Sequence, residues 1–369
     1  MKRWRSSAGL QATLQKRKER EMDRIRLGRT CMMVSRLGFG GIPIQRVSDD
    51  EAVAVVRKCL DLGVTFLDTA NAYTTSEGRI GRAIKGRRQE VIIATKSGSR
   101  TREGLERHLK LSLERLGVDY IDLYQLHGIS DFKSLETVLD PSGPMAAVEE
   151  AKKAGVIRHI GITSHQIDVA KEAVKSGRFE SLMFPFNFIT CEPADQLLPL
   201  CREHDVGFIA MKPLAGGALD NVTIAFKYLL QFGNVLPIPG IEKPREIEEI
   251  VHVLQGPREM SATEQREMQK MRDELGTRFC RRCDYCQPCT QEIPISLMMC
   301  ADTTVKRMPP ERLFTAAFFA DAVEKASNCT QCGDCEERCP YHLPIQEMLA
   351  EQVRYFRQAK QKYEDQMTA

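Results

Sequence analysis

Four side chains suited to acid–base chemistry lie at or close behind predicted strands in the first half of the chain. Asp68 and Tyr73 fall in DTANAY, Lys96 follows IIAT, and His127 ends LYQLH. Tyrosine alone is a weak acid with a pKa of about 10, but a nearby ammonium paired with a carboxylate favours its ionised form. Tyr73 would then protonate an oxygen that gains negative charge, while His127 hydrogen-bonds the same oxygen. Together the four residue types predict the reduction of a carbonyl group.

Cysteines form the second set of reactive side chains, because nine of the 13 follow residue 279. Residues 329–340 read CTQCGDCEERCP, the C-x2-C-x2-C-x3-C-P spacing in which bacterial ferredoxins bind iron–sulfur clusters. Residues 280–289 read CRRCDYCQPC, with cysteines at steps of three. Such crowding in a chain without secretion signals indicates metal binding rather than disulfides. The predicted ligands are Cys280, Cys283, Cys286, Cys289, Cys329, Cys332, Cys335 and Cys339.

These eight thiolates are the number that two 4Fe-4S clusters require. By analogy with two-cluster ferredoxins, one cluster would take Cys280, Cys283, Cys286 and Cys339, and the other Cys289, Cys329, Cys332 and Cys335. The first segment departs from the ferredoxin spacing, so one cluster is the minimum, and zinc is the chemical alternative. Cys300 fits neither series and is predicted to be structural. We expect the remaining four to be small buried hydrophobic residues: Cys31, Cys59, Cys191 and Cys201.

A repeating pattern of elements must position the four acid–base residues. Short apolar runs alternate with amphipathic helical stretches from about residue 36 to 254, which predicts a (β/α)8 TIM barrel. An open doubly wound sheet is the rival, but no G-x-G-x-x-G turn follows the first strand. The predicted strands are 35–41, 64–68, 91–95, 120–126, 157–162, 181–184, 207–211 and 235–238. Each acid–base residue alone could be a cap or a solvated charge; their occurrence at successive strand ends favours catalysis.

The domain organisation follows from the change of pattern along the chain. Residues 1–21 are basic and predicted to be a disordered extension, and residues 22–255 form the barrel. Residues 256–276 form a polar linking helix, and residues 277–369 a small α-helical ferredoxin-like iron–sulfur domain. The formal net charge is only +3, which excludes a broad surface for nucleic acid. Neither a membrane-spanning run nor a secretory signal is found, so we expect a cytoplasmic protein with no membrane partner.

The barrel motifs also resemble those of a known family. DTANAYTTSEGRIGRAI, LYQLHG, GITSH, NFI and PLAGGAL are similar in order and spacing to the motifs of the aldo-keto reductases, over about residues 22–255. The whole chain resembles the branch of this family that carries a C-terminal ferredoxin-type 4Fe-4S domain. The resemblance implies that Tyr73 is the proton donor, that Asp68, Lys96 and His127 complete a tetrad, and that NADP(H) or NAD(H) lies extended across the strand ends.

The same resemblance implies positions for the cofactor. The carboxamide would lie near Ser164 and Asn187, and the pyrophosphate near a proline–leucine pair and a glycine turn. The implied pyrophosphate contacts are Pro213, Leu214, Gly216 and Gly217, and those of the adenosine end are Gly240, Lys243 and Arg245. Some positions depart from the family pattern: Met183 stands where glutamine is common, His165 where asparagine is frequent, and Gly240 and Glu246 where lysine and arginine bind ribose or a 2′-phosphate. Lys243 and Arg245 could still supply charge for NADPH.

The predicted function is an aldo-keto reductase type oxidoreductase that interconverts a small-molecule carbonyl and an alcohol by hydride transfer. One or two 4Fe-4S clusters would relay electrons, to or from the substrate or a redox partner protein. Two alternatives stay open: a carbonyl reductase whose clusters are purely structural, and a non-catalytic subunit that senses NADP(H).

Overall fold

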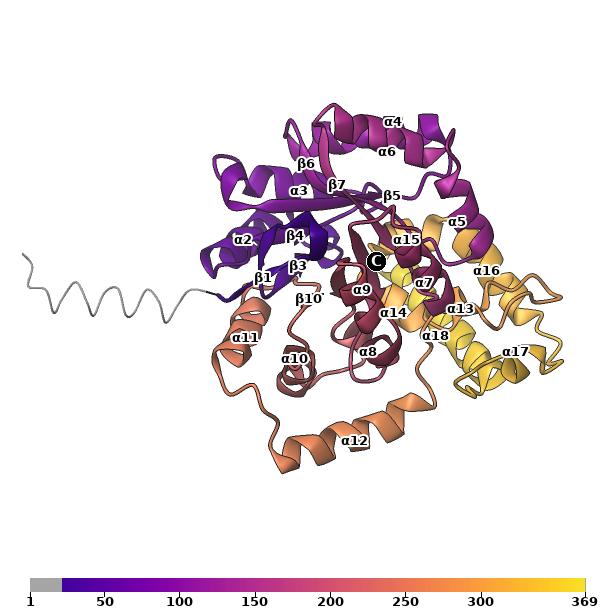
Figure 1. The fold of residues 1–369 in the computed structure, drawn as a ribbon. Coiled ribbons are helices and arrows are strands. Elements are labelled where there is room, and N and C mark those ends of the chain that lie inside the picture. Colours follow the sequence, from indigo (N-terminus) through magenta and orange to yellow (C-terminus); the bar gives the residue numbers. More distant parts are fainter. Residues whose placement is uncertain (1–21, 369) are drawn as a thin grey trace, which may run out of the picture.

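The computed structural model describes residues 22–368, and eight parallel strands form its centre. Each strand pairs with its neighbour in chain order, and a bridge between Gly40 and Gly240 links the first and last strands into a barrel (Figure 1). The predicted eight-stranded barrel is therefore confirmed. Its strands are β3 (Gly38–Gly40), β4 (Phe66–Asp68), β5 (Ile92–Ser97), β6 (Ile121–Leu126), β7 (Ile157–Thr163), β8 (Ser181–Pro185), β9 (Gly207–Met211) and β10 (Val235–Ile238).

Helices surround the strands, and local signals set where they begin. Before the first of them, the Ser48 hydroxyl accepts a hydrogen bond from the Glu51 amide and the Glu51 carboxylate accepts one from the Ser48 amide. Between the strands lie α2 (Asp49–Asp61), α3 (Ser76–Ala83), α4 (Arg102–Leu116), α5 (Phe132–Leu139), α6 (Pro144–Lys153), α7 (Ile167–Lys175), α8 (Pro193–Gln196), α9 (Leu198–Glu203) and α10 (Val222–Leu230), and α11 (Pro244–Gln255) follows the last strand. Four single turns are 3-10 helices: η1 (Gly28–Thr30), η2 (Pro43–Gln45), η3 (Arg88–Glu90) and η4 (Ala215–Gly217).

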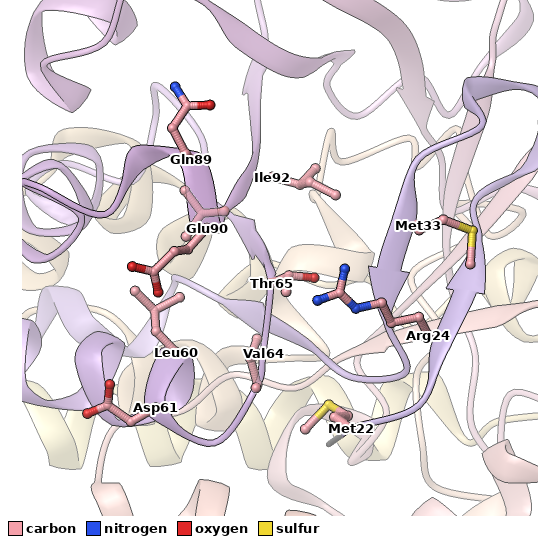
Figure 2. A pocket seen from close by; sticks show the side chains of 12 residues that line it. Met22, Arg24, Met33, Leu60, Asp61, Val64, Thr65, Gln89, Glu90 and Ile92 are labelled. Carbon is pink, nitrogen blue, oxygen red and sulfur yellow. The ribbon is translucent and has the colours of Figure 1, made fainter. Parts of the chain in front are cut away.

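An antiparallel hairpin of β1 (Arg24–Arg26) and β2 (Met33–Ser35) closes the amino-terminal end of the barrel. Leu27 and Val34 from this hairpin join the buried side chains that fill the barrel interior. A cleft of about 660 Å³ lies at the same end, beside Arg24, Asp61 and Glu90 (Figure 2). Catalytic residues of TIM barrels lie at the carboxyl ends of the strands, so we assign no chemistry to this cleft.

A second group of helices forms a C-terminal module, the name used here for residues 277–368. Helix α12 (Ala262–Gly276) leads to it along the outside of α10, where Lys227 pairs with Glu264 at 2.7 Å (Figure 1). The module has a hydrophobic core of its own, which includes Met298, Leu313 and Phe356. Its helices are α13 (Ile295–Met298), α14 (Ala301–Arg307), α15 (Pro310–Thr315), α16 (Ala317–Ser327), α17 (Asp334–Glu337) and α18 (Ile345–Thr368).

The module docks on the carboxyl-terminal end of the barrel. Arg281 donates a hydrogen bond to the Ile189 carbonyl at 2.9 Å and pairs with Glu192 at 3.2 Å. The Tyr285 hydroxyl donates to the Asp168 carboxylate at 2.8 Å. The cysteine segments therefore lie at the same end of the barrel as Asp68 and Lys96.

Among residues 22–368, no helix has the length and apolar character needed to cross a membrane.

The four cysteines outside the module were predicted to be buried. Cys59 and Cys201 are buried as predicted, and Cys191 is partly buried. The prediction is wrong for Cys31, which is exposed because it follows η1 in the left-handed conformation with a φ of 56°. The extension predicted for residues 1–21 lies outside the described residues.

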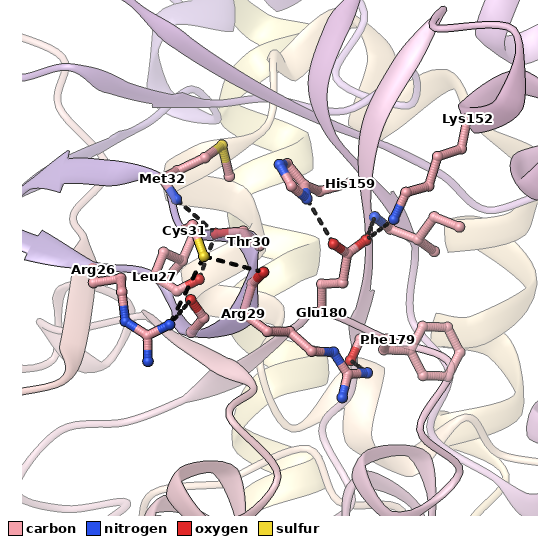
Figure 3. A network of polar contacts seen from close by, with 12 residues as sticks. Arg26, Leu27, Arg29, Thr30, Cys31, Met32, Lys152, His159, Phe179 and Glu180 are labelled. Atoms are coloured by element: carbon pink, nitrogen blue, oxygen red, sulfur yellow. Dashed lines mark hydrogen bonds and ion pairs between the residues drawn. The ribbon is translucent and has the colours of Figure 1, made fainter.

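A polar network at the amino end of the strands stabilises the barrel (Figure 3). The Glu180 carboxylate lies 2.7 Å from His159 Nδ1 and 2.6 Å from Lys152 Nζ, and it accepts a hydrogen bond from the Ile160 amide at 3.0 Å. Burial alone would raise the pKa of Glu180, but these three partners outweigh burial and lower the pKa to about 2. The ionised carboxylate is thus a stabilising element that links β7 to the start of β8.

We predict that Glu180→Gln lowers the free energy of unfolding at pH 7 by about 1 to 3 kcal/mol, since one pKa unit corresponds to about 1.4 kcal/mol. The folded-state pKa lies below the unfolded value, so this stabilisation is present above about pH 4.5 and is lost as the pH falls toward about 2. Urea unfolding followed by circular dichroism between pH 7 and pH 3.5 measures it. Glu172→Gln, in an exposed pair with Lys175, is the matched control and should change little. A Glu180→Gln deficit that stays constant with pH would contradict the prediction.

Candidate active site

A buried ion pair forms the base of the site at the carboxyl ends of β4 and β5. The Lys96 ammonium lies 2.6 Å from Asp68 Oδ2 and donates a second hydrogen bond to the Thr69 carbonyl at 2.6 Å. The other carboxylate oxygen of Asp68 accepts a hydrogen bond from Gln125 Nε2 at 3.2 Å. Asp68 is 3% exposed and Lys96 1% exposed, so water screens neither charge. The pair is thus held by specific partners rather than by solvent.

Tyr73 and His127 complete the group that the sequence predicted. The Lys96 ammonium lies 4.9 Å from the centroid of the Tyr73 ring. The Tyr73 and His127 rings meet edge to face, with their centroids 6.0 Å apart. Four side chains from β4, the loop after it, β5 and the end of β6 therefore meet at one end of the barrel.

Burial and charge set the protonation of these groups. Burial alone would lower the pKa of Lys96, but Asp68 and Tyr73 outweigh it and raise the pKa. Burial raises the pKa of Tyr73, and the Lys96 ammonium opposes this rise. Burial, Lys96 and Arg100 lower the pKa of His127 to about 3. At neutral pH the site therefore holds a charged lysine, a protonated tyrosine and a neutral histidine. Burial keeps the pKa of Tyr73 above the value that the Lys96 charge alone would give.

A pocket of about 190 Å³ extends from this group across the strand ends. Tyr73 and Asp68 lie in its wall, together with residues from the turns after β9 and β10. Gly216 and Gly217 have φ values of 81° and 92°, which glycine adopts readily, and they leave the backbone open to the pocket. The residues predicted to contact the cofactor that line this pocket are Pro213, Leu214, Gly216, Gly217 and Gly240.

Other predicted cofactor residues lie outside the pocket wall. The Asn187 amide donates to the Lys212 carbonyl after β9 and accepts from the amides of Ile189 and Thr190, so both of its polar atoms already have backbone partners. The buried Ser164 hydroxyl bonds the backbone of Gln166.

The predicted cations Lys243 and Arg245 are exposed near the start of α11. Glu246, which stands where the family has arginine, accepts hydrogen bonds from the amides of Glu242 and Lys243. It therefore caps the helix rather than facing the pocket.

Two cations in the pocket wall were not predicted from the sequence. Lys212 precedes the Pro213–Leu214 pair, has a φ of 55°, and places its Nζ 3.0 Å from His165 Nε2. Burial, then the nearby Arg282, lower the pKa of Lys212 to about 7. Arg307 comes from α14 of the C-terminal module. The position of Lys212 within the motif could have indicated a role, but nothing local in the sequence distinguishes Arg307.

The cysteines of the two segments come together in the module. A narrow cavity is lined by Cys289 of the first segment and by Cys329, Cys332 and Cys335 of the second. Cys286 lines it as well. Cys289, Cys329, Cys332 and Cys335 are the four ligands predicted for one cluster.

Other cysteines of the module lie close to one another in pairs. Cys339 is close enough to Cys283 to raise the pKa of its thiol, although burial is the larger cause. Cys300 lies beside Cys280, with its Sγ 3.9 Å from the Cys280 carbonyl oxygen. Within residues 22–368 no three potential ligands converge as one ion requires.

Comparison with known proteins identifies the family. The profile of the aldo/keto reductase family matches residues 36–223, and that of a 4Fe-4S dicluster domain matches residues 279–344. The chain belongs to the aldo/keto reductase family and is an oxidoreductase. Within that family it has the branch architecture predicted from the sequence, a barrel followed by a 4Fe-4S domain.

Individual relatives agree with this family. The uncharacterized oxidoreductase YqkF of Bacillus subtilis is 35% identical over 214 residues, 54% of this chain and 67% of that protein. L-galactose dehydrogenase of Arabidopsis thaliana is 34% identical over 215 residues, 53% of this chain and 66% of that protein. The solved holo form of aldo-keto reductase AKR11C1 from Bacillus halodurans is 28% identical with a TM-score of 0.61, covering 68% of this chain and 96% of that one. The matched region thus spans about two thirds of the first two relatives.

The cavity geometry leads to a prediction about iron content. After anaerobic reconstitution, Cys335→Ala should lose about half of the iron of the parent protein, because one of two clusters loses a ligand. Cys300→Ala, the matched control, should keep the full iron content. Colorimetric iron and sulfide determination with the visible absorption spectrum measures both. Equal iron loss in the two variants would instead make Cys300 a ligand.

Proposed function

We propose that this chain interconverts a carbonyl and an alcohol with NADP(H) or NAD(H), and that Tyr73 is the general acid. The observation that carries the proposal is that Tyr73 and Asp68, both in contact with the buried Lys96, lie in the wall of a pocket that continues to Gly216, Gly217 and Gly240. A dinucleotide is long, so its nicotinamide and adenosine halves would contact opposite ends of such a pocket. Its nicotinamide, when bound, supplies or accepts the hydride.

The chain's own residues handle the proton. In the reducing direction the Tyr73 hydroxyl donates its proton to the carbonyl oxygen, and the Lys96 ammonium stabilises the phenolate that remains. Asp68 keeps Lys96 charged and in place. His127, neutral at physiological pH, donates a hydrogen bond to the same oxygen and orients the carbonyl. In the oxidising direction the phenolate takes the proton back.

We favour NADP(H) over NAD(H) as the cofactor. Lys243 and Arg245 follow Gly240 of the pocket wall and lie at the start of α11, where a helix N-terminus also favours a phosphate. Relatives support both choices: one from Schizosaccharomyces pombe is named aldo-keto reductase yakc [NADP(+)], and one from Escherichia coli is named NADH-specific methylglyoxal reductase. The substrate is a small carbonyl compound or alcohol.

We propose further that the module binds two 4Fe-4S clusters, with Cys280, Cys283, Cys286 and Cys339 on one and Cys289, Cys329, Cys332 and Cys335 on the other. The cavity lined by the second set supports this arrangement. The clusters would relay electrons, because α14 of the module that holds them reaches the pocket wall at Gly216 and Arg307. The rival function, a reductase with structural clusters, is favoured by the contacts of the module with the barrel. A non-catalytic NADP(H)-sensing subunit would not need the four side chains that meet at Tyr73.

Tyr73→Phe tests the general acid. We predict a fall in kcat for carbonyl reduction of about 10² to 10⁴, because the proton donor is lost while the ring remains. Tyr120→Phe is the matched control, since Tyr120 stacks with Arg88 and Arg158 away from the pocket. Stopped-flow oxidation of NADPH with a panel of aldehydes, ketones and quinones measures the rate. An unchanged kcat in Tyr73→Phe would remove this residue from the mechanism.

Electron relay is tested by cluster reduction. Adding NADPH anaerobically to the oxidised protein should produce the electron paramagnetic resonance signal of reduced clusters. Oxidation of one NADPH releases two electrons and one proton, so complete reduction of two one-electron clusters would consume one NADPH. Dithionite establishes the full signal for comparison. A full dithionite signal with no NADPH signal would support the purely structural role instead.

A further inference from the structure

Helix α14 of the C-terminal module packs directly against the glycine turn of the barrel. A Cβ placed on Gly216 would lie only 3.2 Å from Thr303 Cγ2 and 3.4 Å from Arg307 Nη2. The positive φ favours glycine at position 216, and the approach of this helix leaves little room for a larger side chain. The Asp302 amide donates to the side chain of Gln352 on α18 at 2.8 Å, which holds α14 in this position. The module thus supplies a wall of the pocket and not only a neighbouring domain.

Arg307 is the side chain that α14 presents to the pocket. The side chain is partly buried, and within residues 22–368 its guanidinium has no hydrogen-bond or ion-pair partner. Burial lowers its pKa, and the cations Arg46 and Arg282 lower it further, while Cys300 and Asp302 act in the opposite direction. Burying a guanidinium among other cations is costly unless an anion compensates. The surroundings of Arg307 are therefore those of an anion-binding site.

The position of Arg307 along the pocket indicates which anion. Tyr73 and Asp68 lie in the wall where hydride transfer is proposed, and Gly240 lies where the adenosine end is expected. Arg307 lies in the same pocket wall against Gly216, in the glycine turn that the sequence predicted to contact the pyrophosphate. The planar guanidinium has donors spaced to bind phosphate oxygens in pairs.

We propose that Arg307 of the iron–sulfur module binds the pyrophosphate of the nicotinamide dinucleotide, so that the module completes the cofactor site of the barrel. The inference rests on the proposed function. It assigns to the module a direct part in cofactor recognition that is independent of whether its clusters carry electrons.

The experiment measures cofactor affinity in the intact, cluster-loaded protein. Isothermal titration of NADP⁺ and NAD⁺ under anaerobic conditions should give a Kd for Arg307→Ala that is about 10- to 100-fold weaker than for the parent, the loss expected for charge-assisted hydrogen bonds. Lys306→Ala is the matched control, because it removes the same charge from the same helix at an exposed position. It should bind as the parent does. Arg307→Lys should bind with intermediate affinity, since it keeps the charge without the paired donors.

A second arm identifies the bound anion. Inorganic pyrophosphate should displace NADP⁺ from the parent protein, and it should displace it less effectively from Arg307→Ala. An anionic substrate bound at Arg307 would instead leave NADP⁺ affinity unchanged and raise KM for carboxylate-bearing carbonyls. Such a result overturns the proposal.

Measurements of folding, iron content and cofactor binding distinguish a failure of the Arg307 proposal from a failure of the proposed function. Iron content and thermal midpoint equal to the parent's show that Arg307→Ala is folded and cluster-loaded. If the arginine only balances cluster charge, its replacement would shift the reduction potential of the cluster and change cofactor Kd by less than about twofold, which refutes the inference. Failure of the parent protein itself to bind either dinucleotide would refute the proposed function instead.

Discussion

The site depends on the burial of one ion pair, Asp68 with Lys96, at the mouth of the barrel. Removing two charges from water costs several kcal/mol per ion unless each charge has close partners. The strand register provides them: Asp68 lies opposite Ala94, and Lys96 lies opposite Gln125, whose amide reaches the carboxylate. A shift of either strand by one residue would turn these side chains to the other face of the sheet. The closed barrel is thus the condition for a charged lysine beside Tyr73.

Local patterns were sufficient to predict the strands and the meeting of Asp68, Tyr73, Lys96 and His127, because these residues lie at or just after strand ends that a parallel barrel brings together. Roles that depend on loop conformation were harder to predict. The Asn187 side-chain amide is engaged by the backbone of its own loop and of Lys212, and Cys31 is exposed by a left-handed turn. Arg307 was not predicted at all, since only the docking of α14 against Gly216 brings it to the pocket.

The cysteine spacing predicted the kind of group bound, and the fold adds how the two segments combine. Cys289 lies with three cysteines that follow it by about forty residues or more, because α13 to α16 form a compact core between the segments. The same core fixes α14 against the barrel through α18. Cluster ligation and the shape of the pocket therefore depend on one set of packed helices.

The location of α14 in the chain, after the first cysteine segment and before the second, has a consequence for biosynthesis. All eight strands precede the first cysteine segment in the chain, whereas the helix that forms the wall at Gly216 lies between the two segments. We therefore expect the metallocentre to assemble before the enzyme can bind its cofactor. Damage to the metallocentre by oxygen should then reduce the activity of the adjoining barrel.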